Sequence, residues 1–397
     1  MRNIVVSLFA ILCMGTLEAK PLKVFILAGQ SNMEGHARTS TFPAVEKDPK
    51  TNAIYKEMVD SEGKPIVSDD VWIAYSYGSS GGRPGGDKSG KLSVGWGAKA
   101  DATKIGPEYT FGIYMHKMLD EPILIIKTAW GGKSLHNDYR PPNAGSKSLV
   151  APDKQNEAFK KATGFNYKLM MDYVKKVLAD PKKVCPAYDA KEGYELAGFV
   201  WFQGFNDLVG PYPMADEETR TKDYSEYSRL LSCFIRDVRK ELSASKLPFV
   251  IGVLGTGGKA AKGGTVAFRN AMAAPAKTKE FKDNVVNVFS ENYWPAELDP
   301  IAKKWMGLKI AAKRKYLKEK KKNPDLDKKK LSKQERRAAQ AKSQAEFDAQ
   351  LRGVLTEEEY WLFKNGSSNQ GYHYHGSAKF FGQLGKAFAE GLVALKK

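Results

Sequence analysis

Short apolar runs alternate along this chain with segments whose apolar residues repeat at helical spacing. The apolar runs lie at 22–28, 71–77, 123–128, 196–202, 249–254 and 285–289. Several show little alternation of polar and apolar residues, which is typical of strands covered on both faces. Helical spacing is found near 107–119, 169–178, 230–242 and 378–394. This order predicts an α/β fold, with a mostly parallel sheet in a three-layer α/β/α sandwich.

Four polar stretches are too long to be ordinary connections between such elements. They cover 36–68, 78–104, 132–158 and 205–222. We expect them to form the walls of a cleft, since functional loops gather around a rigid scaffold. The chain shows no internal repeat, and its 397 residues are enough for one large domain.

The formal charge of +18 is concentrated in one segment. Residues 303–342 hold 17 Lys and Arg against 4 Asp and Glu, a net charge of +13. Their composition favours helix, and Asn323-Pro324 should divide the segment into two helices. We therefore expect a basic helical insert at about 302–350. It is either a solvated hairpin or a contact surface for an acidic polysaccharide or cell-envelope component. No nucleic-acid motif accompanies the charge, so nucleic acid is not the expected partner.

The first nineteen residues have the pattern of a secretory signal peptide. Arg2 and Asn3 form a polar head, residues 4–17 are mostly apolar, and the segment ends at the small residue Ala19. The apolar run is too short to predict a stable membrane span, with a membrane-anchored N-terminus as the alternative. We expect residues 20–397 to form a single exported domain, periplasmic or extracellular, interrupted by the insert.

Two cysteines, Cys185 and Cys233, follow the signal segment. Whether they pair in an oxidising compartment is left open by the sequence. Neither has a His or Cys neighbour at ligand spacing, so no metal site is predicted. The glycine pairs at 257–258 and 263–264 match no phosphate-binding or dinucleotide-binding spacing. The expected chemistry requires no metal or organic cofactor.

Four segments carry residues suited to ester chemistry. Gly29–Met33, Thr128–Ser134 and Trp201–Asp207 each come at the end of a predicted strand, and Gly371–Gly376 leads into the last helix. The carboxyl ends of parallel strands meet at one edge of a sheet, where open α/β proteins build their sites. Together the segments offer the hydroxyl of Ser31, backbone N–H groups beside glycines, a side-chain amide and an imidazole. Acyl transfer needs such a nucleophile, oxyanion donors and general base.

These motifs resemble those of the SGNH hydrolase superfamily. The resemblance rests on Gly-Gln-Ser-Asn-Met at 29–33, Gln-Gly-Phe-Asn-Asp at 203–207 and the late histidine. Within the superfamily, the chain is most similar to sialate O-acetylesterase-like proteins and carbohydrate esterase family six, and Ile105-Gly106-Pro107-Glu108 adds to the likeness. The resemblance covers roughly residues 22–300 and 360–395 but not the basic insert. It implies a flavodoxin-like sandwich.

The resemblance also implies a role for each matching residue. Ser31 would be the nucleophile and His373 the general base. The oxyanion donors would be the N–H of Ser31, an N–H at Gly131 or Gly132, and the side-chain amide of Asn206. Support for the substrate site would come from Gln30, Gln203 and Gly204.

The chain departs from the family pattern at the residue that orients the base. Many relatives carry Asp three residues before the histidine, where this chain has Gln370. A backbone carbonyl or a carboxylate from another loop is the expected replacement. His375 is the alternative base, because two residues two apart share a face of an extended backbone.

The first hypothesis is therefore an exported serine esterase that removes O-acetyl groups from a carbohydrate, as a sialate O-acetylesterase or acetylxylan esterase does, through an acyl-enzyme. A non-catalytic carbohydrate-binding protein on a decayed hydrolase scaffold is the alternative, motivated by the missing Asp and the basic insert. A third hypothesis keeps the enzyme but changes the acyl group, as in a lipase or thioesterase. The lack of a long apolar lid helix counts against lipids.

Overall fold

A seven-stranded sheet forms the centre of the computed structural model, which describes residues 20–79, 83–323 and 332–395. The strands are β1 (Leu22–Gly29), β3 (Val71–Tyr77), β4 (Gly86–Lys91), β6 (Ile123–Ala129), β7 (Tyr194–Phe202), β10 (Phe249–Val253) and β11 (Val285–Phe289). Their order is β11-β10-β7-β1-β6-β3-β4, and β4 alone runs antiparallel to its neighbour. The predicted signal segment, residues 1–19, lies outside the described residues.

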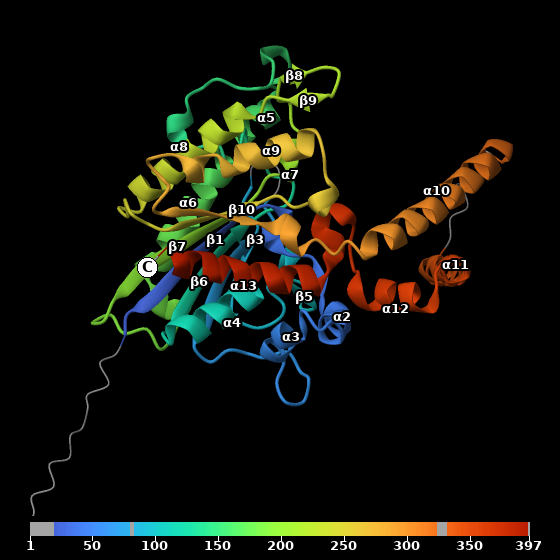
Figure 1. Ribbon diagram of the computed structural model, residues 1–397, viewed down its shortest axis with the longest axis horizontal. Helices are drawn as coiled ribbons and strands as arrows, with labels where there is room; N and C mark the ends of the chain where they lie inside the picture. The colour runs from blue at the N-terminus through green and yellow to red at the C-terminus, as the bar shows by residue number, and fades with distance from the viewer. Residues whose placement is uncertain (1–19, 80–82, 324–331, 396–397) are drawn as a thin grey trace, which may run out of the picture.

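Helices cover both faces of the sheet, so that the central strands are buried on each side (Figure 1). One layer contains α3 (Asn52–Met58), α4 (Glu108–Leu119) and α13 (Ala378–Ala394). The other contains α6 (Phe165–Ala179), α8 (Ser225–Glu241) and α9 (Gly264–Ala273). The predicted three-layer α/β/α sandwich with a mostly parallel sheet is therefore confirmed.

The sheet register places three of the sequence motifs at one edge. Gly29, the last residue of β1, pairs with Ala129 of β6 on one side and with Phe202 of β7 on the other. The polar segments that follow these strands consequently begin side by side. A glycine is required at position 29, because a Cβ there would lie 2.1 Å from the carbonyl oxygen of Phe202.

All six strands predicted from apolar runs are confirmed, as are the four predicted helices. The sequence did not indicate β4, whose residues Gly-Asp-Lys-Ser-Gly-Lys are mostly exposed. This polar segment forms a strand by pairing antiparallel with β3 at the outer edge of the sheet. Short elements within the expected loops or at their ends were also missed: β2 (Ala37–Arg38), α2 (Phe42–Lys47), β5 (Lys104–Ile105), α5 (Glu157–Ala162), β8 (Met214–Asp216) and β9 (Thr221–Lys222).

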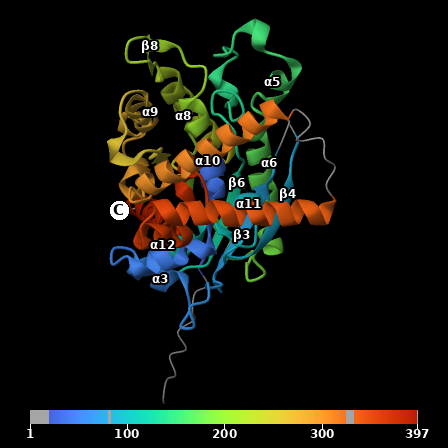
Figure 2. The ribbon, with the colours of Figure 1, turned by 90° about the vertical axis from the view of Figure 1, so that its right-hand side faces the viewer.

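The basic insert forms two long helices, α10 (Leu298–Lys322) and α11 (Lys333–Val354), followed by α12 (Glu357–Gly366). The first helix ends at Lys322 with Asn323 as its C-cap, as predicted from the Asn-Pro pair, and Pro324 lies outside the described residues. Both helices project from the sandwich (Figure 1), and Figure 2 shows them in front of it from the side. A small apolar cluster at their base consists of Leu298, Ile301, Leu351, Leu355 and Tyr360.

A buried ion pair lies under the edge that carries the motifs. Lys127 of β6 and Glu108 of α4 are both 0% exposed, and the Lys127 ammonium donates to a Glu108 carboxylate oxygen at 2.7 Å. The same ammonium donates to the carbonyl oxygens of Glu34 at 2.8 Å and Trp96 at 2.7 Å. Glu108 also accepts from the Gly106 N–H at 2.8 Å. A buried ion pair needs hydrogen-bond partners for both of its charges. Here these partners come from several different segments of the chain.

Cys185 and Cys233 are both free thiols, so the pairing left open by the sequence does not occur. Among the helices of the described residues, none combines the length and apolar character needed to cross a membrane.

The Lys127–Glu108 pair is expected to be necessary for stability. Lys127→Met leaves a buried carboxylate and two buried carbonyls without their donor, which should cost about 3–5 kcal/mol of the free energy of unfolding. Denaturant unfolding followed by tryptophan fluorescence measures this. In the control, Lys127→Met combined with Glu108→Leu should lose less than the single variant, because no charge is then left unpaired. A single variant as stable as the wild type would contradict the assignment.

Candidate active site

Ser31 lies in a tight turn immediately after β1. It begins the short helix α1 (Ser31–Glu34), and the carbonyl of Gln30 accepts from the N–H groups of Met33 and Glu34 at 2.8 and 2.9 Å. The Ser31 residue is 9% exposed. At the end of the turn, the Glu34 carbonyl accepts a hydrogen bond from the Lys127 ammonium. The hydroxyl is therefore carried on a short segment that is anchored at both ends.

The Gln30 side chain joins this turn to the loop after β7. Its amide oxygen accepts from the side chain of Gln203 at 3.2 Å and from the N–H groups of Gly204 and Asn206 at 3.1 and 3.4 Å. The Gln203 amide in turn donates to the carbonyl of Lys133 at 3.0 Å. The structure thus brings together the three residues expected to support the site.

Asp207 connects the third motif with the loop after β6. Its carboxylate is fully buried and accepts from the N–H groups of Leu135 and His136 at 2.7 and 3.0 Å. It also accepts from Gln203 at 2.6 Å and from the Tyr212 hydroxyl at 2.8 Å. The His136 Nδ1 lies 3.1 Å away. Asp207 therefore fixes the position of the loops without facing the solvent.

Of the expected oxyanion donors, Gly131 lies against Ser31. A Cβ built on Gly131 would lie 3.6 Å from the Cβ of Ser31, so this exposed glycine approaches the serine closely. The next residue, Gly132, is exposed and has a φ of +74°, a conformation that favours glycine. Asn206 lies half-buried at the start of α7 (Phe205–Leu208), next to Gly204.

The segment that carries His373 lies against the Ser31 turn. This segment is the 3₁₀ element η9 (Gly371–Gly376), which leads into α13. The amide of Asn32 donates to the carbonyl of Tyr372 at 3.3 Å, which links the neighbour of Ser31 to the neighbour of His373. The Tyr372 ring also lies near that of Phe205, with ring centroids 5.8 Å apart. Residues near the two ends of the described chain thereby meet at one edge of the sheet.

Asn369 contacts the ring of His373 on its Nδ1 side. Its side-chain oxygen lies 3.1 Å from Nδ1 of His373 and also accepts from the Gln370 N–H at 2.7 Å. An acceptor at Nδ1 requires the hydrogen there, which leaves Nε2 of His373 bare, as a general base needs. The expected carbonyl or distant carboxylate is thus corrected to a side-chain amide four residues before the histidine.

A second imidazole packs on His373. The ring of His36 stacks on it with centroids 3.8 Å apart and planes 5° from parallel. The amide nitrogen of Asn369 lies 3.3 Å from Nδ1 of His36, so one amide contacts both rings. The sequence did not predict a role for His36, because nothing in it indicates that His36 and His373 are close in space.

His375 points to a different part of the molecule. Its Nε2 lies 3.2 Å from a carboxylate oxygen of Asp299, and its ring packs edge-on against Trp294. Tyr374 and His375 have φ values of +52° and +57°, so the backbone is not extended here. The expectation that the two imidazoles share a face is therefore wrong.

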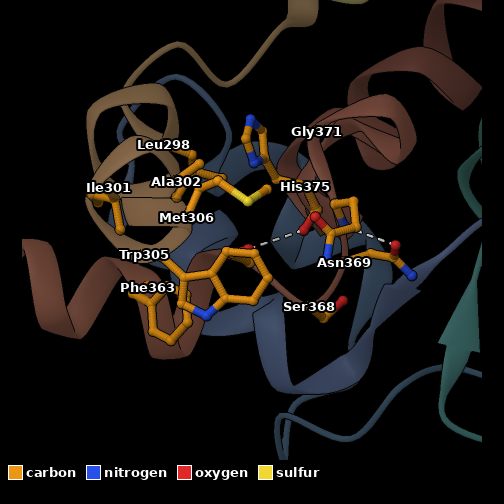
Figure 3. Close-up of a pocket in the computed structure, with 12 residues that line it drawn as sticks. Leu298, Ile301, Ala302, Trp305, Met306, Phe363, Ser368, Asn369, Gly371 and His375 are labelled. Atoms are coloured by element: carbon orange, nitrogen blue, oxygen red, sulfur yellow. Dashed lines mark hydrogen bonds between the residues drawn. The ribbon is translucent and has the colours of Figure 1, made fainter. Parts of the chain in front are cut away.

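A cavity of about 330 Å³ lies on the His375 side of this segment (Figure 3). Its apolar wall comes from α10 and α12 and its polar wall from residues 367–371, including Asn369. The cavity therefore separates the base of the insert from the segment that contacts His373.

Burial and nearby cations set the electrostatics of the site. Burial, with the charge of Lys104, lowers the pKa of His373 to about 4. Burial and the neighbouring His373 lower the pKa of His36 to about 3. Both imidazoles are consequently neutral at ordinary pH. Burial raises the pKa of Glu34, whose carboxylate approaches Gly131, to about 7, against the opposing effect of the Lys127 charge.

Solved structures show distant similarity. A protein from Arabidopsis thaliana is 19% identical, with 68% of this chain and 86% of that chain covered and a TM-score of 0.37. A carbohydrate acetylesterase from Xanthomonas citri is 14% identical, with 67% and 49% covered and a TM-score of 0.38. A family two carbohydrate esterase from Cellvibrio japonicus is 13% identical, with 68% and 52% covered and a TM-score of 0.29. The chain thus spans about half the length of the last two.

A comparison with curated protein sequences found no match. The family model described as "Carbohydrate esterase, sialic acid-specific acetylesterase" matches residues 21–293, which is more than half of the chain and includes the first three motifs. The chain therefore belongs to the sialic acid-specific acetylesterase family of carbohydrate esterases.

Proposed function

We propose that this protein is an exported serine esterase that removes O-acetyl groups from a carbohydrate. The observation that supports it most is the approach of the Ser31 turn to the His373 segment, where Asn369 holds the imidazole in the tautomer of a base. Export rests on the signal-like composition of residues 1–19. The family match supports an acetylated carbohydrate as the substrate.

In the first half of the reaction, the Ser31 hydroxyl attacks the acetyl carbonyl and its proton passes to Nε2 of His373. The resulting oxyanion is held by N–H groups at Ser31 and Gly131 or Gly132 and by the Asn206 amide, each worth about 3–4 kcal/mol of barrier. The tetrahedral intermediate collapses as the bond to the sugar oxygen breaks. That oxygen takes the proton from His373, and acetyl-Ser31 remains.

In the second half, His373 takes a proton from water, which attacks the acetyl-serine carbonyl. The bond to the serine oxygen breaks, the proton passes from His373 to Ser31, and acetic acid leaves and loses its proton to the solvent. The neutral state of His373 suits both deprotonation steps, because a protonated imidazole cannot accept a proton.

Tyr372 is the proposed contact for the sugar ring. It is 44% exposed and directly precedes His373, and Phe205 lies beside it. An exposed aromatic face packs well against the apolar face of a sugar. Trp130 and Trp201, which also lie near the motifs, are fully buried and belong to the core.

Replacement of Ser31 or His373 tests the proposal directly. Ser31→Ala and His373→Ala should each lower kcat on an aryl acetate and on an acetylated sugar by at least about 10³-fold, since the members of such a unit fail together. The matched control is His375→Ala, which should keep kcat within about threefold because its ring contacts Asp299 instead. Thermal unfolding of each variant verifies that it is folded.

The outcomes separate the hypotheses. Equal turnover by the wild type and Ser31→Ala would refute the esterase, and retained sugar binding would then favour the non-catalytic alternative. Loss of activity in His375→Ala alone would assign the base to His375. Preference for long-chain over acetyl esters would support the lipase or thioesterase hypothesis.

Asn369 is expected to act as a positioning residue. Asn369→Ala removes the acceptor at Nδ1 of His373, so kcat should fall at least about tenfold, towards the 10⁴-fold cost of a misplaced triad histidine. Asn369→Asp keeps an acceptor and adds a negative charge that raises the pKa of His373. It should retain activity and shift the acid limb of kcat/KM to higher pH. An unchanged acid limb in Asn369→Asp would exclude this contact in the working enzyme.

The pH profile should report the lowered pKa of His373. Because only the neutral imidazole accepts a proton, kcat/KM should rise through a pH near 4 and stay level above it. Lys104→Gln removes a cation that disfavours the imidazolium, so its acid limb should move up towards the ordinary pKa of 6.5. Lys64→Gln, an exposed lysine on another loop, is the control and should leave the profile unchanged. If the acid limb of the wild-type kcat/KM profile already lay at pH 6.5, burial would not lower the pKa of His373.

A further inference from the structure

The basic insert presents a long cationic surface that the proposed reaction does not use. Helix α10 has 25 residues, which at 1.5 Å per residue makes it about 37 Å long. Its apolar contacts are gathered at its base, where Trp305 and Leu308 pack on the cluster that includes Leu298 and Ile301. From position 309 to position 322 every residue is exposed, and Figure 1 shows α10 projecting away from the sandwich. The outer part of the helix therefore contributes no side chains to a core.

Four cations line one face of this outer part. Arg314, Lys315, Lys318 and Lys322 surround a shallow groove on α10, together with Ala311 and Glu319. The spacings 314–318 and 318–322 are those of neighbours on a helix, so like charges stand close together along the face. Like-charged pairs at this spacing destabilise a helix, and the residues of this face are exposed. A partner of opposite charge would turn this repulsion into attraction.

The base of the insert lies across one cavity from the segment that contacts His373. Leu298, Ile301 and Trp305 of α10 line the same cavity as Asn369, the residue that contacts the His373 ring (Figure 3). Cations also lie on the active-site side, where Lys104 acts on His36 and His373. Positive charge is thus present both along the projecting helix and beside the reacting groups.

We propose that the face formed by Arg314, Lys315, Lys318 and Lys322 binds an anionic polysaccharide and retains it near Ser31. This inference rests on the proposed function, because it takes the ligand from the same class as the substrate. A linear polymer with a carboxylate or sulfate on each repeat can place successive negative charges along the row of cations. The substrate of the esterase is then an acetylated acidic glycan rather than a neutral one.

The distribution of residues favours this ligand over a membrane surface. A helix that lies in a membrane interface segregates its cations from a broad apolar face. On α10 the cations occupy several sides, since Lys309 and Lys313 lie opposite the groove, and the exposed apolar residues of the outer part are few. Nucleic acid would use the same charges without a connection to the ester site, so it serves as a comparison in the test.

The test measures binding of polygalacturonate by the full chain, with dextran as the neutral polymer. We call the face formed by Arg314, Lys315, Lys318 and Lys322 the arm. The arm variant carries Lys315→Gln, Lys318→Gln and Lys322→Gln together, because Gln has nearly the same helix propensity as Lys. The matched control replaces three exposed lysines at the opposite edge of the sheet, Lys182→Gln, Lys191→Gln and Lys246→Gln. Both triple variants lose the same charge, so a difference between them reports position rather than net charge. Circular dichroism verifies that the helices are retained.

The wild type should bind polygalacturonate but not dextran, and about 0.5 M salt should weaken that binding at least about tenfold. The arm variant should bind at least about tenfold more weakly than the wild type, and the control variant within about twofold. Equal binding by the two triple variants would overturn the proposal. So would duplex DNA or anionic phospholipid vesicles binding the arm more tightly than polygalacturonate.

Turnover separates this inference from the proposed function. On acetylated polygalacturonate the arm variant should show a raised KM with little change in kcat, and on an aryl acetate it should match the wild type. One outcome is a wild type that binds polygalacturonate through the arm and yet hydrolyses neither ester. That result would refute the proposed esterase activity and leave the proposed binding site standing. Full turnover with no binding through the arm would refute the site and leave the esterase.

Discussion

The Lys127 ammonium is the interaction on which the site depends. It lies inside the sandwich, at the edge of β6, and holds together a carboxylate on α4 and the carbonyls of Glu34 and Trp96. A buried charge requires all its partners to be present at once, so these segments form one unit. The turn that carries Ser31 ends at Glu34 and is therefore set by the ion pair.

Amide and carboxylate side chains extend this rigidity across the sheet edge. Gln30 connects the serine turn to the loop after β7, and Asp207 connects that loop to the loop after β6. Asn369 then holds both imidazoles above the turn. Several of these contacts join segments far apart in the chain, 174 residues for Gln30 and Gly204 and 72 residues for Asp207 and Leu135, so the geometry of the site is a property of the whole fold rather than of any one motif.

The fold could be predicted because its strands are continuous apolar runs. The placement of Gln30, Ser31 and Gln203 at one edge of the sheet could be predicted because these residues follow such strands directly. The contact between Asn369 and His373 could not be predicted from the sequence. It depends on the left-handed backbone at Tyr374 and His375, which the pattern of residues does not indicate. His36 was missed for a similar reason: its significance is its stacking on a ring 337 positions away. Position in space, not residue type, distinguishes these two.

The polar strand β4 has a consequence for the molecule among its neighbours. It closes one side of the sheet with Asp87, Lys88 and Lys91, and its residues are mostly exposed. An outermost strand with free backbone groups invites a strand from a second molecule, and charged side chains there oppose such pairing. The residues that hid this strand from an apolar pattern thus protect the protein against aggregation.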